Sequence, residues 1–102
     1  MKKAFFIYST FPNIKIARNI AKKLVEKNLV SCVNIFKVES YYKWKGKIEN
    51  SKEFVLICKT DSKRVNNAIM EIEREHPYEI PFIGKIPLEI NKKYFDWMIS
   101  EK

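Results

Sequence analysis

Apolar residues along the chain alternate between strand-like runs and helix-like stripes. Residues 4–8 form a short apolar run that favours a strand, and the Ser-Thr-Phe-Pro-Asn sequence after it indicates a turn. The next apolar positions recur at helical spacing with basic residues opposite them, which predicts an amphipathic helix that ends at Asn28. The positions of this stripe are Ile16, Ala17, Ile20, Ala21, Leu24 and Val25.

The middle of the chain predicts a long hairpin followed by a second helix. Residues 29–45 and 47–60 are extended segments on either side of Gly46, and residues 54–58 are an unbroken apolar run. Asp61 or Ser62 is suited to cap a second helix, which Pro77 ends. The apolar stripe of this helix is Val65, Ala68, Ile69 and Ile72.

The last part of the chain predicts a fourth extended segment over residues 80–90 and a short helix capped by Asn91. Because Pro81 and Pro87 cannot donate to a strand ladder, we expect this segment at a sheet edge or at a bulge. The resulting order, β-α-β-β-α-β with a C-terminal helix, spans residues 1–102 as one domain. It predicts a ferredoxin-like α+β sandwich with a long hairpin.

The predicted strands carry more apolar surface than one layer of helices covers. Helices in a ferredoxin-like fold lie on one face of the sheet, yet residues 5–7 and 54–57 are apolar on both faces. The arm of residues 29–45 would also extend on the order of 55 Å, which is longer than a small sheet. Both features predict an oligomer in which a second copy covers the face of the sheet that the helices leave exposed.

Composition and charge exclude several classes of protein and of binding site. The chain has 46% hydrophobic residues and two glycines, which excludes a disordered chain and a glycine-rich phosphate loop. Its net charge of +8 is dispersed and mixed with acidic residues, so we expect no specific nucleic-acid site. The N-terminal apolar run is too short for a secretory or membrane segment, and Cys32 and Cys58 form no disulfide framework. These features predict a cytoplasmic protein.

Aromatic residues alternate with lysines over residues 41–47, and this pattern allows two interpretations. The first is a stacking platform for single-stranded nucleic acid. The second is an interface in which Tyr42 and Trp44 pack on a neighbouring copy while the lysines stay in water. Because the sheet already needs a partner, we favour the interface.

The sequence offers no set of residues suited to catalysis. Cys32 and Cys58 lie among apolar strand residues, where a free cysteine behaves as a small apolar side chain. A cysteine paired with His76 would still lack an orienting partner. We therefore expect no enzymatic activity.

The sequence Glu-His-Pro-Tyr-Glu-Ile-Pro contains His76, the one histidine of the chain. It follows Ile72 by four residues, in the last turn of the second predicted helix, where the helix C-terminus favours an imidazolium. One interpretation is a structural corner between this helix and the edge strand. The other is a weak copper or zinc site that recruits Glu75, Glu79 or a cysteine, because one histidine cannot form a tight zinc site. We favour the corner, with His76 available for weak binding of a divalent metal.

Several motifs occur together in one order along the chain. They are Thr10-Phe11-Pro12, Cys-Val-Asn within residues 29–35, Trp-Lys-Gly-Lys at 44–47, Lys59-Thr60, His-Pro-Tyr-Glu-Ile-Pro at 76–81, and Tyr94 with Trp97. With this order and spacing, the chain resembles the CutA divalent-cation-tolerance family from end to end.

The resemblance implies a ferredoxin-like protomer in a tight homotrimer, with hairpin strands that extend onto neighbouring sheets. It also implies a cytoplasmic, non-enzymatic protein linked to copper tolerance, to the response to metal ions and to binding of divalent cations. Such trimers are similar to nitrogen-regulatory PII proteins, so a signalling or effector-binding module is the alternative function. Binding of single-stranded nucleic acid is a less favoured alternative, and whether the protein has a membrane partner is left open by the sequence.

Copper ligands attributed to this family include a cysteine just before the Thr-x-Pro motif and two adjacent histidines before Pro-Tyr. Here those positions hold Ser9, Glu75 and His76, so His76 is the one nitrogen donor and Glu75 offers oxygen. We take His76, Glu75 and Cys32 as candidate ligands of a weakly bound copper or zinc ion. The candidate trimer-interface residues are Tyr42 and Trp44.

Overall fold

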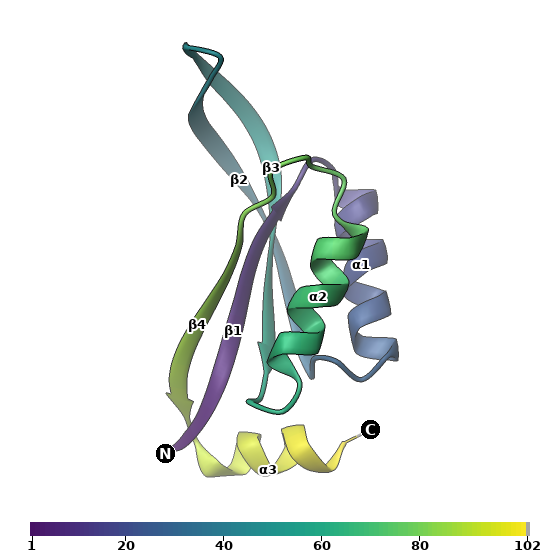
Figure 1. Ribbon diagram of the computed structural model, residues 1–102. Helices are drawn as coiled ribbons and strands as arrows, with labels where there is room; N and C mark the ends of the chain where they lie inside the picture. Colours follow the sequence, from purple (N-terminus) through teal and green to yellow (C-terminus); the bar gives the residue numbers. More distant parts are fainter. Residues whose placement is uncertain (102) are drawn as a thin grey trace.

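The computed structural model describes residues 1–101 and confirms the predicted order of elements (Figure 1). The elements are β1 (Lys2–Phe11), α1 (Ile14–Glu26), β2 (Cys32–Trp44), β3 (Lys47–Thr60), α2 (Val65–Glu75), β4 (Ile83–Ile90) and α3 (Lys92–Ser100). The sheet order is β2-β3-β1-β4, and each neighbouring pair is antiparallel. In Figure 1, α1 and α2 lie on one face of the sheet and α3 lies across the end opposite the hairpin turn. No helix in the described residues is long and apolar enough to span a membrane.

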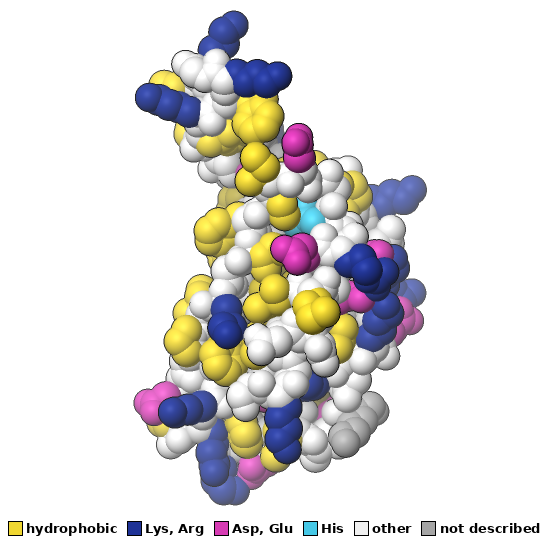
Figure 2. All heavy atoms as spheres, in the orientation of Figure 1, with side chains coloured by type: hydrophobic (Ala, Val, Ile, Leu, Met, Phe, Trp, Pro, Cys, Tyr) yellow, Lys and Arg dark blue, Asp and Glu magenta, His cyan; other side chains and the backbone are white. Residues whose placement is uncertain are grey.

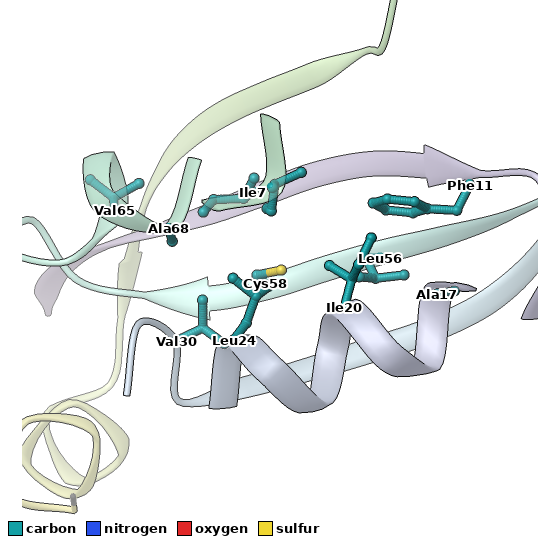
Figure 3. Close-up of a cluster of buried hydrophobic side chains, with 11 residues drawn as sticks. Ile7, Phe11, Ala17, Ile20, Leu24, Val30, Leu56, Cys58, Val65 and Ala68 are labelled. Carbon is teal, nitrogen blue, oxygen red and sulfur yellow. The ribbon is translucent and has the colours of Figure 1, made fainter. Parts of the chain in front are cut away.

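The core lies between the sheet and the two long helices. Figure 3 shows Ile7, Phe11 and Leu56 of the strands in one cluster with side chains of both helices, among them Ile20 of α1 and Ala68 of α2. These side chains are almost completely buried. Burying apolar surface of this kind provides most of the favourable free energy of folding.

Cys58 is part of this core, and its chemistry follows from its burial. Its side chain is fully buried, and desolvation raises the pKa of the thiol to about 12. The thiolate is therefore a negligible species at neutral pH. Cys58 acts as a small apolar side chain, as the sequence predicts.

The end of α1 agrees with its prediction at residue level. Asn28 has a φ of 56°, the left-handed conformation for which asparagine is suited. The Leu29 N–H donates to the carbonyl of Leu24 at 2.9 Å, and the Asn28 N–H donates to that of Val25 at 3.0 Å. These two bonds form a Schellman motif, which directs the chain back towards β2.

The β2–β3 hairpin extends beyond the rest of the sheet (Figure 1). Trp44 pairs with Lys47 across a turn whose residues Lys45 and Gly46 have φ values of 51° and 79°. Two positive values are typical of the type I′ turn, which matches the twist of the strands. Because β1 pairs with β3 only as far as Phe54, residues 38–53 have no third strand beside them. We call residues 38–53 the arm.

The face of the sheet opposite the two long helices is apolar, as the sequence predicts. Phe6, Tyr8 and Ile57 share this face with Phe36 and Ile86, because side chains alternate along each strand. Phe36 is 43% exposed and Ile86 is 45% exposed. We call this surface the open face.

Several boundaries differ from the prediction, and β2 begins at Cys32 rather than at residue 29. The helix α2 begins at Val65, because Asp61 caps a preceding turn by accepting the N–H groups of Lys63 and Arg64 at 3.0 and 3.2 Å. That helix ends at Glu75, so His76 lies just beyond the last turn. The fourth strand begins at residue 83 rather than 80, because the chain from Pro77 to Phe82 is irregular; the strand lies at a sheet edge, as expected.

Candidate functional site at the His76 corner

His76 lies where α2 ends and the chain turns towards the end of β1. Its ring stacks on that of Phe11, with centroids 4.3 Å apart and planes 20° apart. The ring of Tyr78 lies near the same imidazole, at a centroid distance of 5.0 Å. Pro77 cannot continue the helix, and this fixes the point at which His76 leaves it.

Both ring nitrogens of His76 have backbone partners. Nε2 lies 2.9 Å from the carbonyl oxygen of Thr10, which can only accept, so Nε2 carries the proton and donates. Nδ1 accepts the N–H of Tyr78 at 3.1 Å. The geometry therefore defines a neutral imidazole with its lone pair on Nδ1, directed at a backbone N–H.

The electrostatics agree with this neutral form. Burial is the largest influence on His76, and it lowers the pKa of the imidazole from its ordinary value of 6.5. The bond to Thr10 and the charge of Glu53 act in the opposite direction with smaller effect. The expectation that the helix C-terminus favours an imidazolium here is wrong, because desolvation dominates at a residue that lies past the helix end.

Tyr78 connects the corner to the arm. Its hydroxyl donates to Oε2 of Glu53 at 2.6 Å, and Glu53 is only 8% exposed. Burial first, and then this bond, raise the pKa of the Tyr78 phenol. Glu53 is not among the residues predicted from the sequence, although a charged residue two positions before Val55, on an apolar strand face, indicates a buried polar contact.

The Glu75 carboxylate belongs to an ion-pair group on the helix layer. It pairs with Lys23 of α1 and, at 3.5 Å, with Arg74. The bond from Lys23 is the main reason why the pKa of Glu75 is lowered. A metal would have to compete with both cations for this carboxylate.

Cys32 lies far from the corner. It pairs with Lys59 of β3, whereas Thr10, the His76 partner, pairs with Val55. Four residues of strand separate these positions, which is on the order of 13 Å. Within the described residues, no group of three His, Cys, Asp or Glu side chains is arranged to hold a metal ion. One protomer thus does not bring His76, Glu75 and Cys32 together.

The arm residues Tyr42 and Trp44 are about half exposed, at 45% and 47%. They line one wall of a cavity of about 700 Å³ between the arm and the loop of residues 77–82. Tyr78 and Glu53 line the same cavity. Ser9 occupies the position at which the family resemblance implies a cysteine ligand. Its side chain is buried and its hydroxyl donates to the Phe82 carbonyl at 2.7 Å, which indicates a structural role.

Comparisons with known proteins agree with this geometry. The family model described as CutA1 divalent ion tolerance protein matches residues 5–101. A divalent-cation tolerance protein CutA from Archaeoglobus fulgidus is 44% identical over 94 residues, which cover 91% of this chain and 92% of the relative. A protein of the same name from Thermococcus kodakarensis is 37% identical and covers 94% and 93%.

Solved structures show the same fold. A structure of the periplasmic divalent cation tolerance protein CutA from Archaeoglobus fulgidus superposes with a TM-score of 0.89 at 41% identity and covers 96% of both chains. The match extends over the whole sandwich and the arm, and the identity is far above the level at which fold alone is shared. The chain therefore belongs to the CutA1 divalent ion tolerance family.

Proposed function

We propose that this protein acts in divalent-cation tolerance as a homotrimer that binds copper or zinc weakly and catalyses no reaction. Family membership supports the tolerance role, because relatives with 37–44% identity carry that name. The observation behind weak binding is the Nδ1 lone pair of His76: the Thr10 bond holds the proton on Nε2, and Nδ1 then has the Tyr78 N–H as its partner.

The residues present fit a weak divalent site and not a tight one. A cation at Nδ1 would displace the Tyr78 N–H and would take most other ligands from water, because Glu75 is held by Lys23 and Arg74. Copper(II) is favoured over zinc at an imidazole nitrogen by the general order of affinities. The lowered pKa of His76 keeps this nitrogen free of a proton at neutral pH.

Calorimetric titration with copper tests this role of His76. Weak binding by the wild type should be lost in His76→Ala and kept in Cys32→Ser, which removes the thiol far from the corner. Tight binding that is unchanged in His76→Ala would contradict the proposal and would direct attention to Cys32 or the carboxylates. Absence of binding in the wild type would contradict it as well.

The trimer is supported by surface that a monomer leaves uncovered. Figure 2 shows apolar side chains along both the body and the arm, with lysine or arginine side chains at the arm tip. The arm has no third strand, and Phe36 on the open face is nearly half exposed. A neighbouring copy that packs on Phe36, Tyr42 and Trp44 would bury this surface.

The absence of catalysis is supported by the state of the side chains that would be needed. Burial keeps Cys58 protonated, and both nitrogens of His76 are bonded to the backbone. Within the described residues we find no nucleophile in contact with a base. Any turnover that disappeared in a correctly assembled His76→Ala variant would contradict this part.

The proposal places the protein in the cytoplasm, because two unpaired cysteines suit a reducing compartment. The similar protein from Archaeoglobus fulgidus is described as periplasmic, so the compartment needs a direct measurement. Fractionation of cells with an antibody against the native chain would decide it. Recovery with the soluble cytoplasmic markers is expected, and recovery with periplasmic markers would contradict the assignment.

A further inference from the structure

Three carboxylates of the described chain are less than a tenth exposed: Asp61, Glu53 and Glu71. Two of them have cationic partners. Asp61 pairs with Arg64 at 2.8 Å, and Glu71 pairs with Lys27 at 2.6 Å. Glu53 has no basic side chain within 4 Å among residues 1–101, although its burial is the same.

An uncompensated carboxylate at such a position is costly, because charge is removed from water without a counter-charge. The Tyr78 hydroxyl donates to Oε2 and compensates part of this cost. The other oxygen, Oε1, has no hydrogen-bond donor within the described residues, yet it is not sealed from solvent. Glu53 therefore has one oxygen free to meet a cation.

That cation can arrive through the cavity of about 700 Å³ between the arm and the loop of residues 77–82. Its walls include three glutamates, Glu49, Glu53 and Glu79. None of the described residues that line it is lysine or arginine. The chain as a whole has 20 basic and 12 acidic residues. The lining of this cavity therefore has the opposite charge to the protein as a whole.

The aromatic residues of the cavity suit the same kind of ligand. Tyr42, Trp44 and Tyr78 contribute to its walls, and aromatic faces attract cations through their quadrupole. A metal ion is disfavoured, because the carboxylates of the cavity are not grouped as a set of three ligands. A weakly hydrated organic cation needs one counter-charge and apolar contact, and the cavity offers both.

We propose that this cavity binds a small organic cation, with an ammonium group paired to Glu53 and placed against Trp44 and Tyr42. The site goes beyond the proposed role in metal tolerance and does not involve the His76 nitrogens. In the proposed trimer, Tyr42 and Trp44 would direct one ring face to the cavity and the other to a neighbouring copy. The binding of an ammonium ligand would then be separable from copper binding.

Choline chloride is a suitable probe, because its neutral isostere 3,3-dimethylbutan-1-ol has the same shape without the charge. In a Trp97→Phe background, Trp44 is the one tryptophan left to report binding by fluorescence. Choline should change this fluorescence saturably, and the isostere should not. Glu53→Gln should weaken choline binding on the order of tenfold or more, because the buried counter-charge is lost.

Glu39→Gln is the matched control. It removes the same charge from the arm, but Glu39 is exposed and lies on the opposite side of the strand from Ser40 and Tyr42. Choline binding should be unchanged in this variant. A second variant, Trp44→Leu, should also weaken choline binding while it leaves Glu53 in place; because this variant lacks the fluorescent reporter, calorimetric titration compares it with the wild type. Circular dichroism should show that each variant is folded.

Three results would overturn the proposal: equal binding of choline and its isostere, equal binding by wild type and Glu53→Gln, or no binding of choline by the wild type. In the last case light scattering tests whether Glu53 takes part in assembly instead. Dissociation of the oligomer in Glu53→Gln but not in Glu39→Gln would show that the Glu53 carboxylate contacts a second copy and not a small ligand.

Discussion

The Tyr78 hydroxyl and the Glu53 carboxylate lie 2.6 Å apart, and their hydrogen bond joins the loop after α2 to the base of the arm. The same loop holds His76, whose Nδ1 accepts the Tyr78 N–H. Tyr78 thus fixes two features at once: the orientation of the imidazole and the position of a nearly buried carboxylate. Removing the hydroxyl separates these effects, because the backbone bond stays.

Tyr78→Phe should lower the free energy of unfolding by about 1–3 kcal/mol, because Glu53 loses its one donor among the described residues. Tyr78→Ala should cost about 3 kcal/mol in total, since the ring contact with His76 is lost as well. Urea unfolding measures both changes. In a Glu53→Gln background the cost of Tyr78→Phe should shrink; an unchanged cost would mean that the hydrogen bond contributes nothing.

Local patterns were sufficient to predict most of the fold. The stripe from Ile16 to Val25 and the left-handed Asn28 are set by neighbouring residues, so α1 and its end could be identified from spacing. The apolar open face followed from strands without alternation. The start of α2 was misplaced because Asp61 caps a turn before the helix, and a capping residue alone does not say how many residues precede regular structure.

The site was less predictable, because its contacts join residues far apart in sequence. Tyr78 and Glu53 are 25 positions apart, and His76 and Thr10 are 66 apart. The sequence identified His76 as a candidate but contained no information on which ring nitrogen would carry the proton and which would keep its lone pair. The neutral state of the ring depends on burial against Phe11, which only the packed structure defines.

Stability should fall between neutral pH and pH 5 because of His76. Its pKa in the folded protein is below the ordinary value of 6.5, so the unfolded chain takes up the proton first. The contribution of His76 is therefore complete above pH 6.5 and is lost as pH falls through the folded pKa. Protonation would also put a proton on Nδ1 opposite the Tyr78 N–H.

Urea midpoints at pH 8 and pH 5 test this, with His76→Gln as the control. Glutamine offers one donor and one acceptor but does not titrate, so its midpoint should change less between the two pH values than that of the wild type. Glu71 and Glu75 have pKa values lowered from 4.5, so their ion pairs persist at pH 5 in both proteins. Equal pH dependence of the two proteins would show that His76 does not titrate on unfolding.

Assembly should depend on the open face and not on exposed apolar residues in general. Phe36→Glu should convert the expected trimer into monomers, because a charge would be buried at the centre of the proposed interface. Val25→Glu is the control: Val25 is 47% exposed, close to the 43% of Phe36, but it lies on α1. Light scattering at dilute concentration should give three times the chain mass for the wild type and for Val25→Glu. A monomeric wild type would disprove the trimer.

Arg64 should be a much larger contributor to stability than its position in a turn suggests. Its guanidinium donates to Asp61 through Nε at 2.8 Å, to Asn28 Oδ1 through Nη1 at 3.1 Å, and to Ser31 Oγ through Nη2 at 2.6 Å. Nη2 also donates to the Met98 carbonyl at 3.5 Å. One side chain thus connects the loop after α1, the segment before β2, the end of β3 and α3.

Arg64→Met should therefore lower the free energy of unfolding by about 3–5 kcal/mol, because it keeps most of the apolar stem and leaves Asp61 buried without its cation. Lys92→Met is the matched control. It breaks the Lys92–Asp96 pair, whose side chains are 72% and 50% exposed, and should cost less than about 1 kcal/mol. Urea unfolding of both variants gives the comparison. If the two losses were equal, the network around Arg64 would contribute no more than a surface ion pair, and α3 would be held in place by its apolar contacts through Met98.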